Sequence, residues 1–229
     1  RGAEAPPALL PPPSMIAARA AASTDILWAD FRQTVLKAAL FGWVVGNGAA
    51  FLTALALDRS EFLKRGLMPV GTLISAAPIV GIAPIMVMWF GFDWRSKAAV
   101  AIVMVFFPML VNTVRGLEAA DGLQRDLMRS YAASRRQTLL KLRLPAAAPS
   151  LFRALKITST RALIGAIVAE FFGTTTAGVG FRISTELGRM NIDMVWAEIL
   201  VAALAGSGFY GLIALAERAV VSRRPAMRR

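Results

Sequence analysis

The stretch that decides the fold class is "GLMPVGTLISAAPIVGIAPIMVMWFGF", residues 66–92. It contains no Asp, Glu, Lys or Arg. A transmembrane helix needs about 20 apolar residues, and this stretch is longer than that. Three more uncharged runs cover residues 38–57, 98–114 and 199–216. A fifth run, residues 150–172, is apolar apart from Arg153, Lys156, Arg161 and Glu170. The sequence therefore predicts an all-α, polytopic membrane protein, a helical bundle with about five spans.

The composition agrees with this prediction and excludes several kinds of chemistry. Of the 229 residues, 56% are hydrophobic and 17% are charged, and the mean hydropathy is +0.57. A soluble domain usually carries about 25% charged residues. The chain has no Cys and no His, which excludes disulfides, thiolate chemistry and the usual zinc sites. It has no Gly-x4-Gly-Lys-Ser/Thr pattern for nucleotide phosphates. No catalytic, metal or cofactor site is predicted.

The positive charges are distributed unevenly between the two sets of loops. Of the 26 Lys and Arg residues, 17 lie in residues 58–65, 115–156 and 218–229, and eight lie in the loops of the other side. Lys and Arg concentrate in short cytoplasmic loops. We therefore expect these three segments to face the cytoplasm of a bacterial cell, across its inner membrane.

The chain divides into three parts on the same evidence. Residues 1–30 begin with "RGAEAPPALLPPPS" and predict an extended, Pro/Ala-rich segment on the outer, periplasmic side. Residues 31–218 form the transmembrane domain, and residues 219–229 a basic cytoplasmic tail. We expect one further helix before residue 1 if the full protein starts in the cytoplasm.

The connection over residues 117–149, which we call the basic loop, is too long to be a simple link between two spans. It contains "RSYAASRRQTLLKLRLP" at residues 129–145, with five positive charges and no negative ones. Three interpretations compete: a DNA-binding helix-turn-helix, a pad on anionic lipid headgroups, and a docking element for a cytoplasmic partner. Tethering at both ends disfavours DNA binding, and small side chains at Ala132 and Ala133 favour docking. The predicted exposed basic face consists of Arg125, Arg129, Arg135, Arg136 and Lys141.

Two helix-start patterns predict the shape of the basic loop. Asp121 has the position of a cap before a first short helix. Ser134 followed by Gln137 is a capping box, and it predicts a second helix that runs to about Leu144 and is stopped by Pro145. The expected product is two short helices joined by a tight bend.

The basic loop also resembles a loop of a known family. Membrane subunits of bacterial ABC importers carry the pattern Glu-Ala-Ala, three residues, Gly, nine residues, Ile-x-Leu-Pro. Residues 142–145 match its end, which places Ala132 at the glycine and Asp126 at the glutamate. Leu127 and Met128 replace the two alanines. The literal "EAA" at residues 118–120 has the wrong spacing to the Leu-Pro pair.

Three further segments extend the resemblance to residues 30–218: "APIVGIAPIMVMWFGF", "FFPMLVNTVRGL" and "ALIGAIVAEFFG". They look like the importer branch for nitrate, sulfonates such as taurine, and pyrimidine or flavin compounds. The resemblance implies a permease with about six spans that works with two ATPase subunits, a second permease copy and a periplasmic solute-binding protein. It also implies that the ATPase binds the basic loop at Asp126, Arg129, Ser130, Tyr131, Ala132, Ala133, Ser134, Arg135, Leu142, Leu144 and Pro145. In such a machine the external protein largely selects the substrate, so the sequence leaves the substrate open.

A secondary, ion-coupled carrier is the alternative function, but it would favour an internal repeat and paired acids within the membrane, which the sequence lacks.

Gly42, Gly46 and Gly48 predict close packing of the first span. Prolines and polar side chains within spans mark candidate positions for a pathway or gate. These candidates are Pro78, Pro84, Asn112, Arg161 and Glu170.

Overall fold

The structure is a computed structural model that describes residues 11–75, 78–173 and 176–221. Within these ranges the chain forms helices and turns and no strand. Residues 222–229 of the predicted basic tail and residues 1–10 lie outside the described ranges. In chain order the elements, with η for π-helical turns, are α1 (Pro13–Ala22), α2 (Thr24–Phe31), η1 (Arg32–Ala39), α3 (Leu40–Leu57), α4 (Glu61–Ser75), α5 (Ile79–Phe90), α6 (Trp94–Glu118), α7 (Gly122–Ser130), α8 (Arg135–Thr138), η2 (Leu139–Arg143), α9 (Leu144–Glu170), α10 (Val179–Gly188) and α11 (Ile192–Val221).

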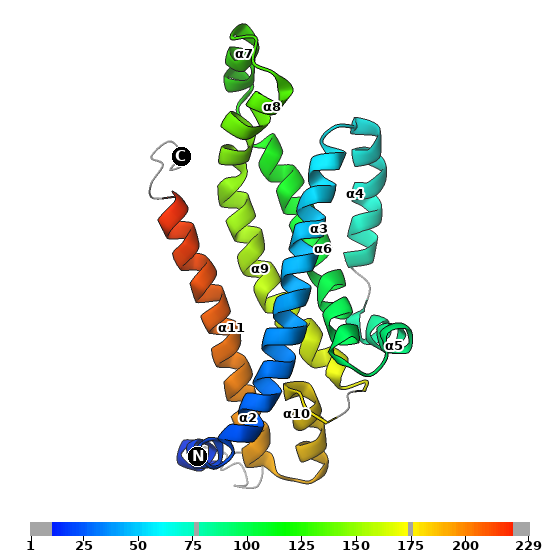
Figure 1. The fold of residues 1–229 in the computed structure, drawn as a ribbon, viewed down its shortest axis with the longest axis vertical. Helices are drawn as coiled ribbons and strands as arrows, with labels where there is room; N and C mark the ends of the chain where they lie inside the picture. The colour runs from blue at the N-terminus through cyan, green and yellow to red at the C-terminus, as the bar shows by residue number, and fades with distance from the viewer. Residues whose placement is uncertain (1–10, 76–77, 174–175, 222–229) are drawn as a thin grey trace, which may run out of the picture.

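Four long helices, α3, α6, α9 and α11, run side by side along the long axis of the molecule (Figure 1). Helix α6 packs against α3 and α9, and α9 packs against α11. In the part of the chain that the structure describes, three helical segments are long and apolar enough to cross a bilayer: Thr24–Leu57, Trp94–Glu118 and Ile192–Val220. The prediction of an all-α, polytopic membrane protein is confirmed. Helix α9 has the length of a span, but its charged residues make it less apolar than the other three.

The sequence predicts that the uncharged run of residues 66–92 forms one span, and this prediction is wrong. It is divided between α4 and α5, and Pro78 stands before the first turn of α5 in an extended conformation, with φ −67° and ψ 123°. Proline lacks the N–H that a helix interior requires. Figure 1 shows α4 lying beside α3 and α5 turned away from the direction of the long helices. The chain therefore changes direction inside this run.

The N-terminal segment also differs from its prediction. Pro13–Ala22 and Thr24–Phe31 are helical, so the expected extended conformation of residues 1–30 is wrong for these residues. Proline fits the first helical turn, because the N–H that it lacks has no partner there. Leu27 is buried with Met194 and Ala197 of α11. This contact explains why a Pro/Ala-rich segment becomes ordered against the bundle.

Small residues allow the central helices to approach closely. A Cβ atom on Gly42 of α3 would lie 2.5 Å from the Cβ of Ala101 on α6, and one on Gly46 would overlap Val105. The predicted close packing is confirmed for these two glycines. Gly48 has open space around its Cα, so for that glycine the prediction is wrong.

The two ends of the bundle differ in what they carry. Helices α7 and α8 of the basic loop project at one end, which we call the loop end, together with the turn between α3 and α4 (Figure 1). Helices α1, α2, α5 and α10 gather at the other end, which we call the far end. The candidate sites below lie at these two ends and along α9 between them.

Candidate functional site

The basic loop contains the predicted bend, and its backbone has a special conformation. Helix α7 ends in two hydrogen bonds, from Ala133 N–H to the Met128 carbonyl at 3.0 Å and from Ala132 N–H to the Arg129 carbonyl at 2.8 Å. This is the Schellman pattern of a helix C-terminus, in which the residue after the cap is left-handed and is usually glycine. Here Ala132 occupies that position with φ +50°. The resemblance had placed Ala132 at a glycine of the importer pattern, and the backbone explains why glycine suits it.

The second short helix begins as predicted but does not end as predicted. Ser134 accepts a hydrogen bond from Gln137 N–H at 3.2 Å, and the Gln137 side chain accepts one from Ser134 N–H at 2.7 Å, so the capping box is confirmed. Pro145 does not stop this helix, which continues through η2 into α9. A π-helical segment, η2, ends at Arg143, and Pro145 is the second residue of α9, where a proline is tolerated in the first helical turn. The basic loop is therefore rigidly continuous with a long helix of the bundle.

The tip of the basic loop exposes both apolar and basic side chains. Leu123 is 77% exposed, Tyr131 76% and Leu127 55%. Arg129 is also exposed and pairs with Asp126 on the same helix turn at 3.2 Å. Large apolar groups on an exposed tip are typical of a surface that binds another protein. The predicted loop residues at the tip, Asp126, Arg129, Ser130, Tyr131, Ala132, Ser134 and Arg135, are exposed. Ala133, in the bend, is half-buried, and so are Leu142, Leu144 and Pro145 at the base of the loop.

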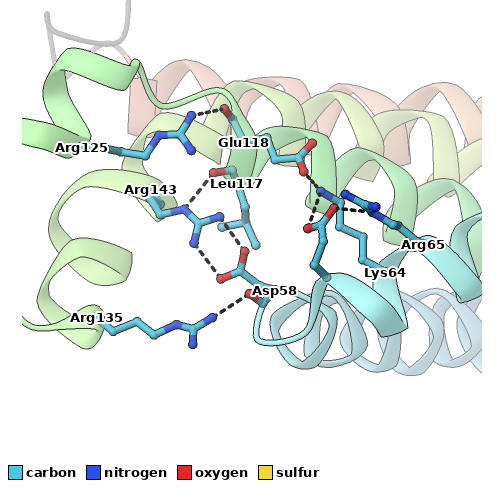
Figure 2. A network of polar contacts seen from close by, with 9 residues as sticks. Asp58, Lys64, Arg65, Leu117, Glu118, Arg125, Arg135 and Arg143 are labelled. Atoms are coloured by element: carbon cyan, nitrogen blue, oxygen red, sulfur yellow. Dashed lines mark hydrogen bonds and ion pairs between the residues drawn. The ribbon is translucent and has the colours of Figure 1, made fainter.

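A polar network joins the base of the basic loop to the turn between α3 and α4 (Figure 2). The Arg143 guanidinium donates two hydrogen bonds to the Asp58 carboxylate, at 2.7 and 2.6 Å, and a third to the Leu117 carbonyl at 3.0 Å. Arg135 donates to the Asp58 main-chain carbonyl at 2.8 Å. The Arg143 and Asp58 side chains are 16% and 18% exposed, so water screens this bidentate pair only in part.

Two further contacts extend the network to the end of α6. Lys64 of α4 forms an ion pair with Glu118, and Arg125 of α7 donates to the Glu118 carbonyl at 3.4 Å (Figure 2). Arg125 also donates to the Ala120 carbonyl at 2.8 Å. The basic loop is thus held to Asp58, directly after α3, and to the end of α6, and Lys64 joins α4 to the same end of α6.

Sequence reasoning missed Asp58 and Arg143 as site residues. They lie 85 positions apart in the chain, and only the fold brings them together. The available signal was local: Asp58 directly follows an uncharged span, and Arg143 stands within the Leu-x-Leu-Pro end of the importer pattern. A cavity of about 440 Å³ lies beside their ion pair, and its lining includes Lys64, Glu118 and Arg129.

The predicted pathway prolines and Asn112 lie on two helices that pack against each other. Pro78 precedes α5, and Pro84 stands inside it. Asn112 of α6 donates to the Pro108 carbonyl of its own helix at 2.7 Å. Asn47, by contrast, accepts a hydrogen bond from Thr158 of α9 at 3.0 Å and so links two helices. The side-chain amide of Asn112 is used within α6.

Glu170 lies in a buried polar cluster at the far end. Its two carboxylate oxygens accept hydrogen bonds from the Thr34 hydroxyl and from Gly180 N–H, both at 2.7 Å. Asp30 accepts one from Gly178 N–H at 2.6 Å and pairs with Arg182 at 2.8 Å. These contacts fix the start of α10 against α2, η1 and α9. The cluster thus uses Glu170 to anchor the connection that follows α9, and the described residues hold no group of His, Cys, Asp or Glu suited to a metal ion.

Arg161 has different surroundings from Glu170. Its side chain is exposed on the surface of α9. Among the described residues it has no hydrogen-bond or ion-pair partner. Of the five pathway candidates, the fold places Pro78 directly before α5 and Pro84 inside it, and leaves Arg161 and Glu170 apart on α9.

Comparison with known proteins decides the family. The model of the family described as binding-protein-dependent transport system inner membrane component matches residues 46–222. The chain belongs to this family. The predicted resemblance to ABC importer permeases is therefore confirmed, and the protein is referred to below as the permease.

Individual relatives agree with the family. The permease is 30% identical to a formylaminopyrimidine transport permease protein of Halalkalibacterium halodurans, over 87% of this chain and 80% of the relative. It is 31% identical to a riboflavin transport system permease protein of Chloroflexus aurantiacus, over 94% and 81% of the two chains. A putative aliphatic sulfonates transport permease protein of Bacillus subtilis is 27% identical over 86% and 71%. The permease is similar to each of these proteins over most of its length.

Proposed function

We propose that the permease forms part of the translocation pathway of an importer and is driven by a separate ATPase subunit that binds the basic loop. The observation that carries this proposal is the combination of an exposed tip with a fixed base. Leu123, Leu127 and Tyr131 offer apolar surface to a partner. Arg143 and Asp58 connect that surface to the spans.

The geometry supports a mechanical role for the loop. The capping box makes the second short helix rigid, and η2 joins it to α9 without a break. The bidentate pair between Arg143 and Asp58 joins the same segment to α3 and α4. A partner that moves the tip would tilt α9 directly and move the α3–α4 turn through this ion pair. The chain itself needs no catalytic group for this task.

The distribution of charge supports an orientation for the permease. Residues 58–65, 115–156 and 218–229 carry 17 of the 26 Lys and Arg residues of the sequence, and under the positive-inside rule this excess supports a cytoplasmic position for the basic loop in a bacterial cell. The far end then faces the periplasm, where a solute-binding protein would deliver the substrate. Two permease copies would enclose the pathway, because each chain offers one docking loop.

The names of the relatives indicate two classes of solute. Their names include a pyrimidine and riboflavin, which are heterocycles, and aliphatic sulfonates, which are anions. We propose a small organic or oxyanionic nutrient as the substrate class of the permease.

The test is native purification from the membrane of a cell that expresses the whole transporter. We expect an ATPase chain with a phosphate-binding loop to copurify, and native mass measurement to give two permease copies per complex. A functional transporter that contains one permease copy, or none of the ATPase, would contradict the proposal.

A further inference from the structure

Helix α9 carries a charged stripe that its neighbours in the fold do not use. The stripe consists of exposed side chains along one face of the helix: Arg153, Ile157, Thr160, Arg161 and Ile164. Arg153 and Arg161 lie about 12 Å apart along the axis and about 80° apart around it at 1.5 Å and 100° per residue. Two cations and a hydroxyl group therefore share one face in the part of α9 that continues from the loop end.

Three other charged side chains in the helices, Lys156, Asp30 and Lys97, have partners within the fold. Lys156, also on α9, pairs with Glu217 of α11 at 2.7 Å, and Asp30 pairs with Arg182. Lys97 donates to the Phe92 carbonyl at 2.7 Å. Arg161 has no such partner among the described residues, and it lies five residues deeper into the span than Lys156. A charged side chain at this depth is costly in lipid, and it is usually found where it faces a water-filled cavity or a counter-charge.

The exposed face of α11 provides the contrast. Its large exposed side chains are apolar: Leu204 is 64% exposed, Leu212 68% and Leu215 61%. An apolar groove of about 580 Å³ between α11 and η1–α3 is lined by Leu36, Leu204 and other apolar residues. This surface suits lipid tails, whereas the stripe on α9 does not. The two exposed faces of the bundle are therefore different in kind.

We propose that the α9 stripe lines the translocation pathway and that Arg161 recognises a negative charge on the solute, so that the permease carries a small anion. The inference rests on the proposed function, because it requires a pathway beside α9. A guanidinium group binds carboxylate, sulfonate or another oxyanion through paired N–H donors. Arg153 lies nearer the loop end and would continue the positive potential in the direction of release. Thr160, next to Arg161, would supply a further hydrogen bond.

Cysteine accessibility tests the inference without knowledge of the substrate. The chain has no Cys, so Ile157→Cys or Ile164→Cys introduces a single thiol one helical turn from Arg161. The assembled transporter in membranes is treated with a negatively charged methanethiosulfonate (the ethylsulfonate) or a positively charged one (the ethyltrimethylammonium). Modification of the permease is measured by mass spectrometry. Leu204→Cys on the apolar face of α11 is the matched control and should react with neither reagent.

The decisive quantity is the rate of modification by the anionic reagent divided by the rate of modification by the cationic one. This ratio is compared between the protein with Arg161 and the Arg161→Gln variant. A unit charge about 8 Å away in water of low ionic strength changes this ratio about fivefold. At low ionic strength we expect the anionic reagent to be favoured, Arg161→Gln to reduce the preference about fivefold, and Arg161→Lys to retain it. Reaction at both cysteines with a ratio that Arg161→Gln leaves unchanged would overturn the anion inference and leave the pathway in place. Cysteines that react no better than Leu204→Cys would contradict the pathway itself.

Discussion

The ion pair between Arg143 and Asp58 gives the sharpest structural prediction. Asp58→Asn removes the charge and places an amide N–H₂ against the guanidinium, which has only donors. Hydrogen bonds to charged groups contribute about 1.5–3 kcal/mol each to stability. The two side chains are partly exposed, at 16% and 18%, so water weakens their interaction. We therefore expect the free energy that holds the basic loop in place to fall by about 2 kcal/mol, less than the combined contribution of the two hydrogen bonds. This corresponds to a roughly 30-fold larger population of the detached loop.

Limited trypsin digestion of the purified permease measures this population. Cleavage of a transiently opened segment follows the equilibrium of opening when reclosing is fast. We expect cleavage after Lys141 to be roughly 30-fold faster in Asp58→Asn than in the wild type. Glu61→Gln is the control, because Glu61 lies in the first turn of α4 and forms its ion pairs within that helix, with Lys64 and Arg65, and not with the basic loop. Equal cleavage rates in Asp58→Asn and Glu61→Gln would refute the claim that the ion pair holds the loop.

Two further predictions concern the backbone. Ala132→Gly should stabilise the bend by about 0.5 kcal/mol. The left-handed conformation costs alanine about 1–2 kcal/mol more than glycine, whereas the greater freedom of glycine in the unfolded chain lowers stability by about 0.4–1 kcal/mol. Slower trypsin cleavage within the basic loop would support this prediction, and faster cleavage would contradict it. Gly180→Ala should lower the stability of the permease by about 1–3 kcal/mol, since its Cβ would overlap the Ile167 carbonyl. Gly188→Ala, where the structure leaves open space, is the control. Thermal unfolding in detergent compares the two variants, and equal midpoints would be evidence against the close packing at Gly180.

The comparison of sequence and structure shows which features are local. The uncharged run at residues 98–114 lies within α6, and the capping box at Ser134 forms with both of its hydrogen bonds. Each depends on residues close together in the chain, so sequence patterns reveal them. Residues 66–92 show the limit of hydropathy, because apolar composition does not report a change of direction. Pro78 was the available sign of that break.

Features that depend on distant partners were out of reach of the sequence. Asp58 meets Arg143 only after α3, α6 and η2 have assembled. The helical conformation of Thr24–Phe31 is supported by the contact of Leu27 with α11, across most of the chain. The role of Glu170 as an anchor likewise follows from Thr34 and Gly180, which no spacing rule connects to it. The sequence identified polar residues of interest, and the fold decided what each one touches.

The central claim is that an ATPase subunit grips the tip of the basic loop, and the affinity of that subunit for the permease tests it most directly. Tyr131, at 76% exposure, is the largest apolar side chain on the tip. Tyr131→Ala should weaken binding in detergent roughly 30-fold, because an aromatic anchor in an interface is worth about 2 kcal/mol or more. Arg136→Ala, an exposed basic position on the same loop, should change it less than about fivefold, as expected for a charge at the rim. Unchanged binding by Tyr131→Ala, together with a large loss in Arg136→Ala, would contradict the docking account and favour a charged pad on the membrane surface.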